Sequence, residues 1–141
     1  MATTNAQTIT IETTVNVPVG QAWEVWVKPE HIVKWNQASA DWHCTKSEND
    51  IRSGGTFSAR MEAKDGSFGF DFGGTHDEVR ENELIASTLG DGRKMSVTFK
   101  GDGNTTHIVE SFEAEGTHPA DMQKAGWQAI LDSYTRYAES L

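Results

Sequence analysis

The sequence predicts an α+β domain in which a curved antiparallel sheet of about seven strands folds around one long C-terminal helix. Residues 40–113 contain only strand patterns separated by turn signals, whereas residues 119–141 carry one long helical pattern. Because strands and helices are segregated along the chain, an antiparallel sheet is favoured over alternating strands and helices. No internal repeat or linker divides the chain, so we expect a single domain over residues 1–141.

The first part of the chain predicts one strand followed by two short helices. Residues 8–17 alternate apolar and polar side chains, which is typical of a half-buried strand. Pro18 ends this strand and suits a helix start, and a tryptophan-rich helical pattern follows as far as Pro29. We expect a second short helix over residues 30–35.

The middle of the chain predicts a meander of about six strands. Its turns are marked by Gly54-Gly55, Asp65-Gly66, Asp91-Gly92 and Asp102-Gly103. The last three are Asp-Gly pairs, which favour tight hairpin turns. Between the turns the apolar residues keep one parity, so each strand presents one apolar face. These sets are Phe57/Ala59/Met61, Phe68/Phe70/Phe72, residues 84–89, Met95/Val97/Phe99 and Ile108/Phe112.

The last segment predicts the longest helix, with an apolar stripe that would close over the sheet. The stripe consists of Met122, Gly126, Trp127, Ile130, Leu131, Tyr134, Ala138 and Leu141. Charged and amide side chains occupy the other positions of this helix, so only the stripe is expected to be buried.

The composition excludes several classes of function. With 12 basic and 21 acidic residues the net charge is -9, and no basic cluster could bind nucleic acid or an anionic membrane. The single Cys44 and the polar N-terminus favour a cytoplasmic protein, and no apolar run approaches the roughly 20 residues of a membrane span. The histidines are scattered and no cysteines are paired, so we expect neither a metal nor a cofactor.

Several segments, taken in order, match one known family. They are Pro18 with the Trp23/Trp26 helix, Trp35, residues 40–43, 54–57, 61–66, 69–72, 91–94, 110–112 and 126–131. The order of elements resembles the helix-grip superfamily of START lipid-transfer domains and polyketide cyclases, and these segments resemble the family of the activator of the heat-shock protein 90 ATPase. Since this superfamily includes binders, carriers and enzymes, the resemblance implies a fold more than an activity.

The aromatic residues on the apolar strand faces predict a cavity for a hydrophobic or aromatic small molecule, such as a lipid or a polyketide-like compound. Its expected apolar lining is Trp35, Trp42, Phe57, Met61, Phe70, Phe72, Met95, Trp127 and Leu131. His43, His76 and Glu110 are the expected polar groups that would orient a ligand.

The position of Glu110 directs a carboxyl group toward the apolar side of the sheet, because Glu110 shares its parity with Phe112. A buried carboxylate needs a partner or a raised pKa. The candidate partners are His43, Arg60 and His107.

His76 faces the same side as Phe72 if the Gly73-Gly74 pair does not shift the strand register, and otherwise it faces solvent.

Three functions follow from these observations. The first is a ligand-binding module. The second is a cyclase or hydrolase in which Glu110 with His43 or His76 acts as acid and base, although no residue is assigned as catalytic. The third, implied by the resemblance, is a co-chaperone domain that meets a chaperone through its acidic surface or the Trp23/Trp26 helix. The sequence leaves open whether the protein is a monomer or a homodimer.

Overall fold

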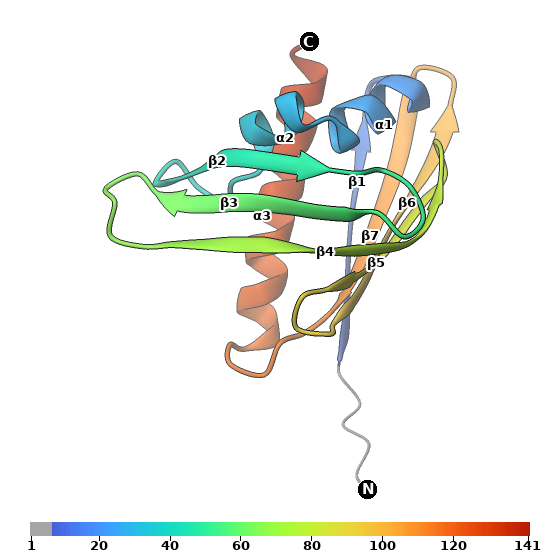
Figure 1. The fold of residues 1–141 in the computed structure, drawn as a ribbon. Helices are drawn as coiled ribbons and strands as arrows, with labels where there is room; N and C mark the ends of the chain where they lie inside the picture. Colours follow the sequence, from blue (N-terminus) through green and yellow to red (C-terminus); the bar gives the residue numbers. More distant parts are fainter. Residues whose placement is uncertain (1–6) are drawn as a thin grey trace, which may run out of the picture.

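A computed structural model describes residues 7–141 as one seven-stranded antiparallel sheet and three helices (Figure 1). In chain order the elements are β1 (Thr8–Val15), α1 (Val19–Val27), α2 (Pro29–Trp35), β2 (Trp42–Asn49), β3 (Thr56–Ala63), β4 (Gly69–Arg80), β5 (Leu84–Leu89), β6 (Lys94–Asp102), β7 (Thr105–Glu113) and α3 (Ala120–Glu139). The strands lie in the order β1-β7-β6-β5-β4-β3-β2. The predicted helix-grip fold is confirmed.

The sheet curls, and α3 crosses its concave side behind β2, β3 and β4 in the view of Figure 1. The two short helices α1 and α2 connect the two edge strands, β1 and β2, and lie at one end of the curled sheet. Strand β1 pairs with β7 along its whole length, from Thr8 opposite Glu113 to Val15 opposite Thr106.

The turn chemistry agrees with the sequence prediction. Gly66 and Gly92, the glycines of two Asp-Gly pairs, have φ values of 78° and 93°, a region that favours glycine. The Gly73-Gly74 pair leaves the β3–β4 register unbroken, and a bulge follows only after His76. A Cβ atom on Gly74 would overlap the Thr88 carbonyl oxygen, so this position accepts only glycine without a shift of the backbone.

The main core lies where α1, α2 and α3 meet the sheet. The ring of Trp26 packs edge-on against Tyr134 and tilted against Trp35, with centroids 4.9 and 5.2 Å apart. The Tyr134 hydroxyl is buried and donates a 2.7 Å hydrogen bond to the carbonyl oxygen of Ala22. This contact connects the long helix directly to α1.

The predicted stripe of α3 is correct in its centre and wrong at its ends. Leu131, Tyr134 and Ala138 are fully buried, whereas Met122 and Leu141 are 58% and 60% exposed. In the first turn of the helix Gln123 is buried instead of Met122.

None of the helices within residues 7–141 is long and apolar enough to cross a membrane.

Candidate functional site

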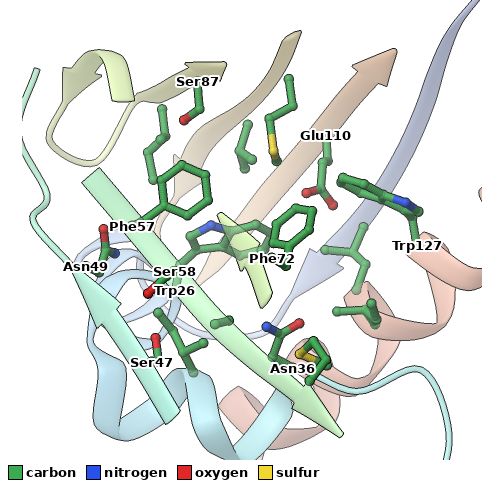
Figure 2. A pocket seen from close by; sticks show the side chains of 18 of the residues that line it. Trp26, Asn36, Ser47, Asn49, Phe57, Ser58, Phe72, Ser87, Glu110 and Trp127 are labelled. Atoms are coloured by element: carbon green, nitrogen blue, oxygen red, sulfur yellow. The ribbon is translucent and has the colours of Figure 1, made fainter. Parts of the chain in front are cut away.

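A pocket of about 400 Å³ lies between the concave face of the sheet, α2 and α3 (Figure 2). Most of the residues predicted from the sequence line it, from strands β3, β4, β6 and β7 and from both helices. They are Trp35, Phe57, Met61, Phe70, Phe72, His76, Met95, Glu110, Trp127 and Leu131. Trp26, Asn49 and Ser87 also line the pocket and were not among the predicted residues.

Trp42 and His43 lie outside this pocket, which corrects the predicted lining. The ring of Trp42 packs at the outer end of β2 against the exposed Phe68 and Phe70, with centroids 6.0 and 5.9 Å apart. His43 points to the opposite face of the strand, where its Nε2 lies 4.0 Å from Glu62 Oε1. Side chains alternate along a strand, and Cys44 is buried, so its neighbour His43 faces the other side.

One wall of the pocket is aromatic. Trp127 of α3 stacks on Phe112 of β7 with a centroid distance of 3.8 Å and an interplanar angle of 11°. Phe72 meets the Trp127 ring edge-on at 5.9 Å. Trp127 is therefore held between the sheet and the pocket, so it belongs to both the core and the pocket wall.

Glu110 supplies a carboxyl group to this otherwise apolar wall. The residue is 6% exposed, and its neighbours across the sheet are Ile11 and Val97. Figure 2 shows the carboxyl group directed into the pocket, beside Phe72 and Trp127. Burial raises its pKa to about 8, so the group is mostly protonated at neutral pH and can donate a hydrogen bond.

The predicted partners of Glu110 lie elsewhere. Arg60 binds Glu62 and Asp71, with N–O distances of 3.1 and 3.5 Å, and His107 Nε2 lies 3.2 Å from a carboxylate oxygen of Glu12. Among residues 7–141 the Glu110 carboxyl group has neither a hydrogen bond nor an ion pair to another side chain. Glu110 therefore has a raised pKa and no charged partner among these residues.

His76 is the second polar group and it faces inward, as expected for an unbroken register. It is 4% exposed, and the Phe57 ring stacks on it at a centroid distance of 4.6 Å. Its Nδ1 lies 3.0 Å from Ser87 Oγ and its Nε2 lies 2.7 Å from Asn49 Oδ1. Burial lowers the pKa of His76, which favours the neutral ring although nearby carboxylates partly oppose the shift.

Neither Asn49 nor Ser87 was recognised from the sequence. Strand alternation could have predicted that Ser87 is buried, because it lies between Ile85 and Leu89 on the same face of β5. A serine or asparagine on such a face is usually satisfied by the backbone, and only the fold shows that a histidine from another strand lies opposite.

Four polar residues near the β7–α3 connection and the β5–β6 turn also line the pocket: Arg93, Glu115, His118 and Gln123. The Gln123 side chain donates to the carbonyl oxygens of Glu115 and His118 at 3.1 and 2.8 Å and accepts from the Glu115 amide at 2.9 Å. These three bonds explain why Gln123 is buried in place of Met122. No group of three or more potential metal ligands occurs in the part of the chain that the structure describes.

Two solved structures combine close structural similarity with substantial sequence identity. The solution structure of an AHSA1-like protein from Aeromonas hydrophila is 41% identical, with a TM-score of 0.89 over 95% of this chain and 93% of that chain. The solution structure of Chr148 from Cytophaga hutchinsonii is 51% identical, with a TM-score of 0.81 over 94% and 92% of the two chains. A search among curated proteins found no significant match.

Protein CV1439 from Chromobacterium violaceum is 21% identical, with a TM-score of 0.84 over 94% of this chain and 98% of that chain, and therefore supports the fold alone. The family model described as "Activator of Hsp90 ATPase homolog 1-like protein" matches residues 16–139, which is nearly the whole of the described chain. The chain therefore belongs to the family of Activator of Hsp90 ATPase homolog 1-like proteins, within the START-like superfamily.

Proposed function

We propose that this protein binds an uncharged, largely hydrophobic small molecule with an aromatic or polycyclic part, in the pocket between the sheet and α3. The observation that carries the proposal is the Glu110 carboxyl group, which is buried, faces the pocket and has no side-chain partner among residues 7–141. Its carboxyl oxygens are not sealed in the protein interior but are open to the pocket. A ligand oxygen in the pocket can therefore pair directly with this carboxyl group.

The chemistry of the wall defines the ligand class. Because the pKa of Glu110 is raised to about 8, the group offers an O–H donor at neutral pH, which suits a carbonyl or hydroxyl oxygen of the ligand. The face of Trp127 suits a flat apolar ring beside that oxygen. A pocket volume of about 400 Å³ lies within the usual range for small-molecule sites.

The family supports the same class of function, because START-like folds commonly bind hydrophobic ligands. A partner that docked on α1, as in the co-chaperone hypothesis, would not meet its tryptophans directly. The side chain of Trp23 is 7% exposed, and Trp26 packs against Trp35 and Tyr134. The burial of these rings thus gives less support to a chaperone that contacts them than the pocket gives to a small ligand.

The test is a titration of the purified protein with fatty acids, sterols, flavonoids and aromatic polyketides. Binding is measured by tryptophan fluorescence and by the thermal melting temperature. A ligand of the proposed class should quench or shift the emission in a saturable way and raise the melting temperature. Glu110→Gln retains a donor and should bind a carbonyl ligand with similar affinity. Glu110→Leu should weaken binding by about tenfold, the effect of one lost hydrogen bond. If no compound in the panel changes the fluorescence or the melting temperature, the proposal is refuted.

A further inference from the structure

The side chains of Ser87, His76 and Asn49 come from three strands, β5, β4 and β2, and form one hydrogen-bonded chain at the pocket. We propose that they form a nucleophile, a base and an orienting group that hydrolyse carboxylic esters bound in the pocket. The proposal rests on the binding function given above and adds a reaction to it. It uses neither His43 nor Glu110.

The hydrogen bonds fix the orientation of the imidazole ring. Asn49 Nδ2 donates to the Val27 carbonyl oxygen at 2.8 Å, so Oδ1 is the atom that faces His76. An amide oxygen only accepts, and His76 Nε2 therefore carries the ring proton. In the neutral ring Nδ1 is then the acceptor, and it faces the Ser87 hydroxyl at 3.0 Å.

This is the arrangement that activates a hydroxyl nucleophile. The base lies within hydrogen-bond reach of the nucleophile and is itself oriented by a third group, as in Ser-His-Asp sites and their Asn-containing variants. The stacked Phe57 ring and the bulge between His76 and Glu78 both adjoin the base and restrict its position. Burial lowers the pKa of His76, which favours the neutral ring that a general base requires.

All three residues line the pocket, although His76 and Ser87 are each only 4% exposed. Figure 2 places Asn49 and Ser87 on the other side of the pocket from Trp127. An ester whose apolar part lies against Trp127 could therefore extend its carbonyl group toward Ser87. The substrate class is a neutral ester with a hydrophobic or aromatic part.

The reaction would proceed in two steps. In the first step Ser87 Oγ attacks the carbonyl carbon and its proton passes to His76 Nδ1. The bond to the alcohol oxygen then breaks, and the alcohol leaves with that proton. In the second step water attacks the acyl group on Ser87, His76 takes a proton from the water, and Ser87 recovers it as the carboxylic acid leaves.

The first measurement is covalent labelling of the folded protein with a hydrophobic fluorophosphonate, followed by peptide mass spectrometry. We expect one adduct, on the peptide that contains Ser87. The second measurement is the hydrolysis of p-nitrophenyl esters of increasing acyl length. Ser87→Ala should abolish the adduct and lower kcat/KM by at least about 100-fold. Ser96→Ala is the matched control, because Ser96 lies on β6 between Met95 and Val97 and faces away from the pocket.

Asn49 acts through His76, so it is a positioning residue, and Asn49→Ala should lower kcat more than it raises KM. If Ser87→Ala fails to fold, Ser87→Cys keeps the shape of the site and should give an acyl adduct on the same peptide.

Labelling elsewhere, or ester hydrolysis unchanged in folded Ser87→Ala, would overturn the proposal. Saturable binding of a ketone isostere without any adduct would refute hydrolysis and leave the binding function standing. Failure of the isostere to bind would instead count against the binding function itself.

Discussion

Replacing Glu110 by glutamine should stabilise the protein at alkaline pH by an amount that grows with pH. Burial raises the pKa of the Glu110 carboxyl group from 4.5 to about 8 in the folded state. In the unfolded chain the ordinary pKa returns, so between these values unfolding releases a proton from Glu110. The stability contributed by the protonated form is therefore complete below pH 4.5 and is lost progressively as the pH rises to about 8.

The size of the effect follows from the shift. One pKa unit corresponds to about 1.4 kcal/mol. The change from 4.5 to about 8 therefore corresponds to about 5 kcal/mol in the free energy of unfolding. Glutamine has a similar shape and does not ionise. The stability difference between Glu110→Gln and the unchanged protein should grow by about 5 kcal/mol over this pH range.

The assay is urea unfolding of both proteins at several pH values from 4.5 to 9, followed by far-UV circular dichroism. Taking the difference between the two proteins cancels the titration of all other groups. Glu83→Gln, at an exposed position in the β4–β5 turn, is the matched control. If the free energies of the unchanged protein and Glu110→Gln run parallel across this pH range, Glu110 ionises normally in the folded protein and the reasoning is refuted.

Two further predictions concern the fold itself. Tyr134→Phe should lower the free energy of unfolding by about 1–3 kcal/mol, because the buried Ala22 carbonyl loses its 2.7 Å hydrogen bond. A melting temperature unchanged by this substitution would contradict that role. Gly74→Ala should destabilise the sheet severely or prevent folding, since a Cβ atom would overlap the Thr88 carbonyl oxygen. Gly20→Ala, at a helical position with open space around it, is the control and should stabilise α1 by roughly 0.5–1 kcal/mol.

Much of the architecture was predictable because each element carries a local signal. Strand periodicity, Asp-Gly turns and the helical stripe of α3 gave the order of the elements and the buried face of each strand. The same parity argument placed Glu110 on the inside, and it placed His76 there only if the Gly73-Gly74 pair kept the strand register, which the structure shows it does. Periodicity identifies a face because side chains of a strand alternate strictly.

The position of a residue along its strand was less predictable. Trp42 shares the face of Cys44, yet it lies near the outer end of the sheet, where the pocket no longer reaches. Parity alone does not give the distance from a strand residue to α3. The contacts of Asn49 and Ser87 with His76 depend on the register of strands that are far apart in sequence, and no local pattern encodes that register.

The pairing of β1 with β7 has a consequence for how the chain reaches its native state. Ile9 of β1 lies opposite Phe112 of β7. The first strand of the chain therefore pairs with the last one. Loop closure over such a sequence separation is slow compared with hairpin formation. During synthesis on the ribosome, at about 5–20 residues per second, β1 must wait for nearly the whole domain to emerge. We therefore expect the hairpins from β2 onward to form first and β1 to join the sheet late.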